Sequence, residues 1–329
     1  MNWRALATAS LALALALALS TTGPAEAQKK RLAMGCTAAT SSHYAYCVGQ
    51  AKAINTAVPE VDVSVVETGA TVDNLKRMQK GTIDYGLITN EQVYLAHRGE
   101  GAWKDGPFPD IRNLWYYTIS AVYVVVREET GVKSIEELAG KKFSPGFRGS
   151  ATEKMTEASL THLGVKADWF RGGNADLVDA MKDKRLVGNA KAGDGFRLDA
   201  SSMDIATSTP IRVLPWTDEQ VRKVKTQFPY YPWVRVPAGS VKGMGEFWTQ
   251  AVVVGFSAPK SMPVDVAYRL VKAVIEDKEH QRAAFKGLVD DLGKATLEQS
   301  LSPLHAGAVK YFREKGVKVP DHLVPQEAK

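Results

Sequence analysis

The sequence predicts an α/β fold of two lobes, and three patterns lead to that prediction. Short apolar or β-branched segments alternate with helical segments from residue 31 onward, as in a mostly parallel sheet covered by helices. Two continuous apolar strands, Val122–Arg127 and Ala251–Phe256, mark places where the chain crosses to a second lobe near Tyr123 and returns near Val253. Loops rich in Gly, Ser and Thr follow several strands, at the sheet edge where α/β proteins bind ligands.

The first lobe is predicted from residues 28–122 and completed by residues 253–329. Its strands are short β-branched or apolar runs, and its helices end near Pro59 and Gly81, residues that interrupt helical structure. The predicted strands are Arg31–Cys36, Val61–Thr68, Ile83–Thr89 and Ala251–Phe256. The predicted helices are Tyr44–Ala57, Val72–Lys80, Asp265–Asp277 and Leu304–Lys315, the third of which carries an apolar face.

The second lobe is predicted from residues 123–252. After the apolar strand Val122–Arg127, strands are predicted at Phe143–Pro145 and near Ala167–Phe170. Helices are predicted at Glu153–Leu163 and Ala175–Lys184, which restores the strand–helix alternation.

The first 27 residues have the pattern of a cleaved secretory signal. Arg4 precedes the apolar run Leu6–Leu19, and Ala25-Glu26-Ala27 forms a small-x-small cleavage site. We therefore expect a mature, periplasmic protein that starts near Gln28, outside the compartment where ATP and reduced nicotinamide cofactors are routine partners. An uncleaved membrane anchor is the alternative, although no basic stop-transfer segment follows.

Composition indicates a soluble mature protein that does not bind nucleic acid. The net charge is +6, but the Lys and Arg residues are scattered rather than clustered, and no later apolar segment approaches membrane-spanning length. We expect a monomer without a cofactor. Cys36 and Cys47 could form a disulfide in an oxidising compartment or remain as two buried thiols.

Four loops at strand ends are candidate binding loops: residues 37–44, 67–74, 89–91 and 146–153. The fourth is the strongest, because its glycines allow close approach to a ligand and it opens a helix whose N-terminus attracts anions. Within these loops Arg148 could pair with a carboxylate, His43 could contact one, and Tyr44 is the aromatic expected in the cleft. Other expected contacts are hydroxyl and amide groups: Thr40, Ser41, Ser42, Thr68, Thr71, Asn90, Ser150 and Thr152. Each loop could instead only cap its own helix.

Signals for catalysis and metal binding are weak. The six histidines form no close pair of the kind that binds zinc, and no phosphate loop or nucleophile elbow occurs. Ser257-Ala258-Pro259-Lys260 matches the Ser-x-x-Lys pattern of penicillin-binding enzymes, but the companion motifs are missing. We interpret His305 as a structural capping or packing residue. The sequence therefore favours a protein that is not an enzyme, with a secreted serine hydrolase as an alternative.

Motifs in order along the chain resemble those of the solute-binding receptors of TAXI-type TRAP transporters. They span nearly the whole mature chain, and the C-terminal ones are the most specific. The matching segments are residues 67–75, 81–86, 99–101, 124–127, 134–141, 149–153, 236–240, 303–308 and 311–316.

The resemblance implies a type II periplasmic-binding-protein fold, in which two α/β lobes close on a solute. It also implies delivery of a small anionic organic solute, such as a dicarboxylate, 2-oxoacid or acidic amino acid, to a TRAP membrane permease. The positions it marks as ligand contacts are Thr68, Gly69, Thr71, Gly149, Ser150 and Thr152. A receptor for an ABC importer or a sensor kinase would share this fold.

The chain departs from the family pattern in two places. The loop at residues 40–47 is longer and more polar than usual, and Lys191 and Asp194 add charge near the expected cleft. These charges could indicate a more acidic or polar ligand, with Lys191 as a contact, or a surface ion pair of little consequence.

Overall fold

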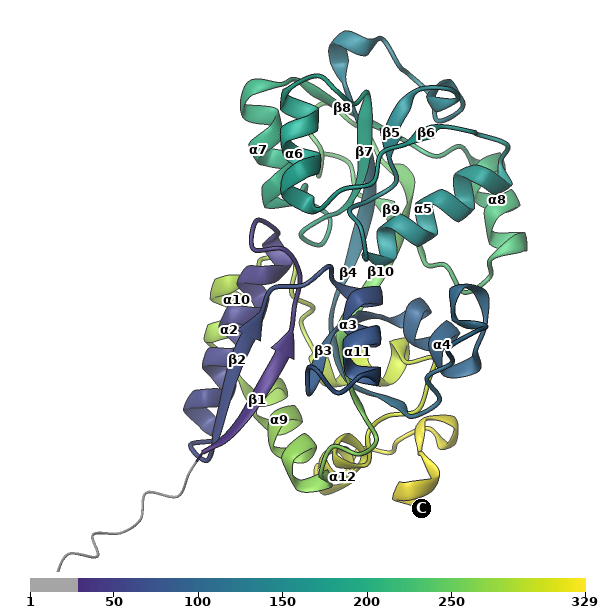
Figure 1. The fold of residues 1–329 in the computed structure, drawn as a ribbon. Coiled ribbons are helices and arrows are strands. Elements are labelled where there is room, and N and C mark those ends of the chain that lie inside the picture. Colours follow the sequence, from purple (N-terminus) through teal and green to yellow (C-terminus); the bar gives the residue numbers. More distant parts are fainter. Residues whose placement is uncertain (1–28) are drawn as a thin grey trace, which may run out of the picture.

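The computed structural model describes residues 29–329 and shows two α/β lobes that share one ten-stranded sheet (Figure 1). The main strand order is β2-β1-β3-β10-β4-β7-β5-β6, with β8 paired to β4 and β9 paired to β10. The predicted signal segment lies outside the described residues. Within residues 29–329, no helix has the length and apolar character needed to cross a membrane.

Lobe 1 contains the N-terminal strands and the C-terminal helices. Strand β1 (Lys30–Gly35) pairs in parallel with β2 (Val61–Val66) and β3 (Tyr85–Thr89), as the strand–helix alternation predicts. Its helices are α2 (Ser42–Ala57), α3 (Thr71–Gln79), α4 (Asn90–Arg98), α9 (Val264–Glu276), α10 (His280–Ala284), α11 (Leu292–Gln299) and α12 (Ala306–Glu314).

Lobe 2 is formed by the middle of the chain. Its strands are β5 (Lys142–Ser144), β6 (Asp168–Trp169), β7 (Gly188–Ala192), β8 (Ile211–Leu214) and β9 (Trp233–Val236). Its helices are α5 (Ala151–His162), α6 (Asn174–Lys182), α7 (Ala200–Ser208) and α8 (Asp218–Gln227). Short 3₁₀ turns occur at Gly101–Trp103, Glu128–Thr130, Glu136–Leu138, Asp321–Leu323 and Gln326–Ala328.

Two long antiparallel strands, β4 (Ile111–Arg127) and β10 (Phe247–Pro259), connect the lobes. In β4, residues up to Ala121 pair with β10, whereas residues from Val122 onward pair with β7 and β8. In β10, the first four residues pair with β9 of lobe 2 and the rest with β4 and β3. The predicted crossing and return points, Tyr123 and Val253, therefore both lie inside these connecting strands.

Two predicted strands are too short, and several elements of the structure were not predicted. Strands β4 and β10 extend well beyond the predicted apolar runs. The prediction did not include the added residues because they mix aromatic, polar and small side chains and show no regular alternation. The loop at residues 89–91 is largely the first turn of α4, and the charged segment around Lys191 is the buried strand β7. The structure also contains elements that were not predicted, namely α7, α8, α10, α11, β8 and β9.

A disulfide joins Cys36 and Cys47, so the first of the two cysteine alternatives is the one the structure contains. Their Cα atoms are 6.3 Å apart, and the bond ties the end of β1 to the first turns of α2. Tyr46 on the same helix stacks on Tyr117 of β4, with ring centroids 3.6 Å apart. These contacts fix the first candidate binding loop against the lobe 1 sheet.

Candidate functional site

A small cavity lies between the lobes, at the carboxyl ends of the parallel strands. It is lined by the N-termini of α2, α3 and α5 and by parts of β3, β7 and β10. The lining residues are Thr37, Ser41, His43, Ala70, Thr71, Leu87, Thr89, Phe147, Ser150, Ala151, Thr152, Lys191, Ala192, Val252 and Val254. Its volume is about 40 Å³, which is room for a few water molecules, so the lobes must separate to admit a larger solute.

Three threonine hydroxyls in the cavity wall are free to bind a ligand. Thr37 and Thr71 belong to lobe 1 and Thr152 to lobe 2, and all three are at least 95% buried. The hydrogen bonds formed among residues 29–329 do not include these hydroxyls. Thr37, the second residue after the end of β1, was not among the predicted contacts. Its position at the strand end is the signal that could have identified it.

Ser150 lines the cavity but uses its hydroxyl within its own lobe. The oxygen accepts from the backbone N–H of Glu153 at 3.1 Å, and the hydroxyl donates to the carbonyl of Phe147 at 2.7 Å. Ser150 is thus the N-cap of α5, as the capping interpretation of this loop requires. The groups of the loop that remain for a ligand are Ala151, the Thr152 hydroxyl and the positive end of the helix dipole.

Lys191 brings a buried positive charge to the cavity wall. Its ammonium lies 3.3 Å from the carboxylate of Asp199 and 3.2 Å from the hydroxyl of Ser41 in lobe 1. The same ammonium lies 4.8 Å from the ring centroid of Phe147. The side chain of Lys191 is 4% exposed and that of Asp199 is fully buried. The interpretation as a surface ion pair is therefore wrong.

The acid near Lys191 was also misidentified. Asp194 accepts a hydrogen bond from the backbone N–H of Gly287 at 2.6 Å and does not line the cavity. The partner is Asp199, which was not among the predicted residues. An Asp before Ala-Ser-Ser is a typical helix N-cap and could have been recognised as one, but its contact with Lys191 depends on the fold.

His43 is a neutral polar group in the cavity wall at pH 7. Burial lowers its pKa to about 4, and the charge of Lys191 adds to that decrease. Its Nδ1 lies 2.6 Å from the hydroxyl oxygen of Tyr117, while Nε2 has no hydrogen-bond partner among residues 29–329. His43 can therefore offer a ligand a hydrogen bond but no charge.

Four predicted contact residues join the lobes to each other instead of lining the cavity. Thr40 accepts from the side-chain amide of Asn174 at 2.7 Å, and Ser42 accepts from the backbone N–H of Ala200 at 2.9 Å. Gly69 and Gly149 face each other, and the carbonyl of Gly149 accepts from the N–H of Val72 at 2.9 Å, at the N-terminus of α3. When the lobes are together, the second and fourth loops thus meet each other, and the first loop contacts the starts of α6 and α7.

The close approach of Gly69 and Gly149 leads to a prediction about closure. A Cβ on Gly149 would lie 2.9 Å from the carbonyl oxygen of Gly69, and the φ of Gly149 is 87°. Gly149→Ala should therefore destabilise the closed arrangement by about 1–3 kcal/mol and increase the radius of gyration measured by small-angle X-ray scattering.

The matched control is Gly164→Ala, because Gly164 has a similar φ of 79° but open space at its Cβ. It should lower stability without changing the radius of gyration. An equal radius for the two variants would show that the glycine contact does not control closure.

The remaining predicted residues serve other parts of the fold. Thr68 donates to the carbonyl of Cys36, and Asn90 accepts from the Tyr116 hydroxyl and the N–H of Leu301, all within lobe 1. Arg148 is exposed and donates to the carbonyl of Arg171. Tyr44 packs against the core without lining the cavity. The structure thus brings together Ser41, His43, Thr71, Ser150, Thr152 and Lys191.

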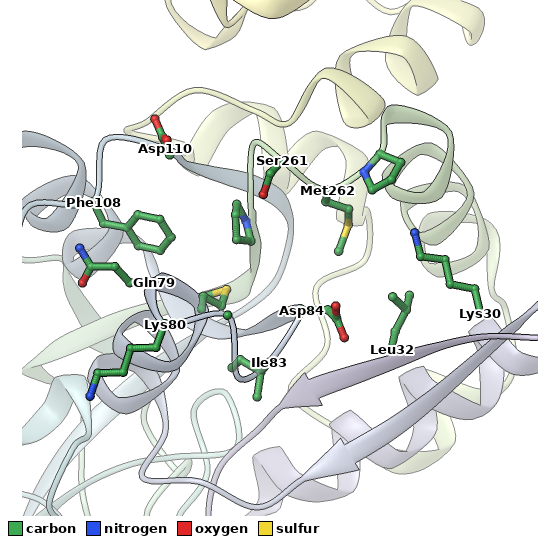
Figure 2. Close-up of a pocket in the computed structure, with 14 residues that line it drawn as sticks. Lys30, Leu32, Gln79, Lys80, Ile83, Asp84, Phe108, Asp110, Ser261 and Met262 are labelled. Carbon is green, nitrogen blue, oxygen red and sulfur yellow. The ribbon is translucent and has the colours of Figure 1, made fainter.

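A larger cavity, about 540 Å³, lies at the opposite end of the lobe 1 sheet (Figure 2). It surrounds the start of β1 and the segment before β3, and none of the predicted contact residues lines it. The acids in its wall are already engaged, since Asp84 accepts from the N–H of Ala33 and Asp110 pairs with Lys260. The smaller cavity is the better candidate site, because it lies at the carboxyl ends of the strands and combines a buried charge with free hydroxyls.

The Ser-x-x-Lys pattern does not form a catalytic pair. Ser257 lies in β10, fully buried, and donates to the side-chain oxygen of Asn113, whereas Lys260 is exposed. His305 is the N-cap of α12 and accepts from the N–H of Gly307, which confirms its predicted structural role. Among residues 29–329, no group of three His, Cys, Asp or Glu side chains is placed to hold a metal ion.

Solved structures with similar folds include two that are described as transporters. A structure described as a periplasmic transporter has a TM-score of 0.54 at 15% identity and covers 88% of this chain and 99% of its own. A putative L-cystine ABC transporter from Listeria monocytogenes has a TM-score of 0.52 at 13% identity, covering 80% and 98%. A protein from Bordetella bronchiseptica RB50 has a TM-score of 0.52 at 16% identity, covering 89% and 91%.

The fold is therefore the two-lobed α/β fold of periplasmic binding proteins, as predicted. The sequence matches the NMT1-like family over residues 34–316, which is most of its length. The chain belongs to the NMT1-like family.

Proposed function

We propose that this protein is a periplasmic solute-binding protein that captures a small anionic organic solute between its lobes and delivers it to a membrane transporter. The observation that carries the proposal is the cavity itself, where a buried ammonium and three free threonine hydroxyls converge from both lobes. A dicarboxylate, a 2-oxoacid or an acidic amino acid has the carboxylate that such groups bind.

The arrangement of donors suggests how the solute would be held. The ammonium of Lys191 and the N-terminus of α5 supply positive charge from lobe 2, and Thr152 adds a hydroxyl. Thr37 and Thr71 supply hydroxyls from lobe 1. A solute that bonds to both sides stabilises the closed state more than the open one, which is the differential affinity that closure requires.

The transporter we propose is a TAXI-type TRAP permease, on the strength of the sequence resemblance. An ABC importer is the second candidate, favoured by the fold shared with a putative L-cystine ABC transporter. A neighbouring gene for a large multi-spanning permease would favour the first, and a gene for an ATP-binding subunit the second.

Thermal unfolding in the presence of single solutes tests the proposal. The panel contains C4–C6 dicarboxylates, 2-oxoacids and acidic amino acids, with neutral sugars and cationic amino acids for comparison. A solute at 100 times its dissociation constant should raise the unfolding midpoint by roughly 5–10 °C. Stabilisation by neutral or cationic solutes alone would contradict the anionic assignment.

Thr152→Val shows whether a stabilising solute occupies this cavity. The substitution removes a free hydroxyl while Ser150 keeps its capping bond, and it should weaken binding by about tenfold or more. Thr161→Val, at an exposed position of the same helix, is the control and should leave the affinity unchanged. Equal affinities for the two variants would place the solute elsewhere.

A further inference from the structure

Asp199 lies behind the cavity wall and contacts groups from both lobes. One carboxylate oxygen accepts from the backbone N–H of Ser202 at 3.1 Å and the hydroxyl of Ser201 at 2.8 Å, which caps α7. The other oxygen lies 3.3 Å from the Lys191 ammonium and 3.4 Å from the hydroxyl of Ser41 in lobe 1. Asp199 itself has no surface in the cavity.

A buried lysine keeps its proton only when a counter-ion compensates for lost hydration. The Lys191 side chain is almost fully buried, and within residues 29–329 Asp199 is the one acid in ion-pair contact with it. The other titratable group facing the ammonium is His43 from α2, which is neutral at pH 7 and supplies no negative charge. Tyr117 is hydrogen-bonded to His43, and Asp194 accepts a hydrogen bond from the backbone N–H of Gly287.

We propose that Asp199 is a positioning residue that keeps Lys191 charged and aimed at the cavity, so that the two residues together form the anion-binding wall of lobe 2. This inference rests on the proposed function, because it concerns the same cavity and an anionic solute. It also gives Ser41 a role, since its hydroxyl bonds to the pair only when lobe 1 is in place. The serine thus couples closure to the placement of the charge.

The pH dependence of binding in Asp199→Asn tests the proposal. Asn is a good N-cap, so the start of α7 is preserved while the charge is lost. Succinate, 2-oxoglutarate and L-glutamate serve as probes, with dissociation constants measured by calorimetry at pH 6, 7, 8 and 9. The wild-type constant should change little across this range. In Asp199→Asn it should rise towards about tenfold per pH unit, because Lys191 must take up a proton before it can bind the anion.

Two further variants make the result specific. Asp204→Asn on the same helix breaks an exposed pair with Lys182 and should keep the wild-type pH profile. Lys191→Arg in the Asp199→Asn background should remove the pH dependence, because arginine stays charged without a counter-ion. If Asp199→Asn does not fold, Asp199→Ser preserves the cap and replaces it. If Asp199→Asn or Asp199→Ser still binds a probe and its dissociation constant does not change with pH, the proposal is overturned.

A measurement without solute separates this inference from the proposed function. Asp199→Asn should lower the unfolding midpoint by on the order of 10 °C at pH 6 and by less at pH 9, where Lys191 can be neutral. An equal deficit at both pH values would overturn the positioning role. If none of the probes stabilises the wild type while the pH-dependent deficit is present, the proposed function fails and the lysine–aspartate pairing stands.

Discussion

Lys191→Met is expected to lower the free energy of unfolding by about 3–5 kcal/mol and to abolish binding of anionic solutes. The loss of stability follows from Asp199, whose fully buried carboxylate would keep its hydroxyl and N–H donors but lose its cation. The loss of binding follows because the ammonium is the charged group of the cavity wall. Urea denaturation measures the first effect and the solute panel the second.

Two further variants show whether the buried charge is the cause. Lys191→Met combined with Asp199→Asn removes both charges and should recover most of the lost stability without recovering binding. Lys182→Met breaks the exposed pair with Asp204 and should cost no more than about 1 kcal/mol. A double variant as unstable as the sum of the single ones would show that Lys191 acts through packing and not through charge.

Glu91→Gln is expected to stabilise the protein by about 3 kcal/mol at pH 8 and to have little effect at pH 4. Glu91 is fully buried in the first turn of α4, and one of its oxygens has no partner among residues 29–329. Burial raises the pKa of this carboxyl from 4.5 to about 7, although the hydroxyl of Thr89 opposes the increase. Between pH 4.5 and about 7 the folded state holds a proton that the unfolded state has released, so the free energy of unfolding falls as the pH rises.

Urea denaturation of both proteins at several pH values between 4 and 8 gives the difference directly. His43 and His305 each have a pKa lowered to about 4 by burial and destabilise the protein on acidification, but they are present in both proteins and cancel. Glu298→Gln, at an exposed helix position, should show no such trend. A gain that does not vary with pH would mean that the buried charge is not its source.

The sequence predicts the parts of the fold that repeat a local pattern. The strands β1, β2 and β3 and the helices between them were predicted to within a few residues, because each is a short apolar run or a helix interrupted by Gly or Pro. Residues 111–121 of β4 and both ends of β10 were not predicted. Their burial comes from packing on both faces of the sheet, and no periodicity in the sequence reflects that.

The candidate site was predictable as a set of loops but not as a set of contacts. The hydroxyl-rich loops do reach the cavity through Ser41, Thr71, Ser150 and Thr152. Local sequence could not distinguish a threonine with a free hydroxyl from one bonded to a neighbouring strand, such as Thr68. The pairing of Lys191 with Asp199 depends on the N-terminus of α7 lying next to β7, and neither element was predicted.

The chain passes from lobe 1 to lobe 2 along β4 and returns along β10, and this path affects the order in which the lobes fold. The first 90 described residues cannot complete the lobe 1 sheet, because β3 pairs with residues 254–257 of β10. Lobe 2 can pair most of its strands earlier, from residues that lie close together in sequence. Such long-range pairing makes folding slow, and we expect lobe 1 to be the last to form during refolding.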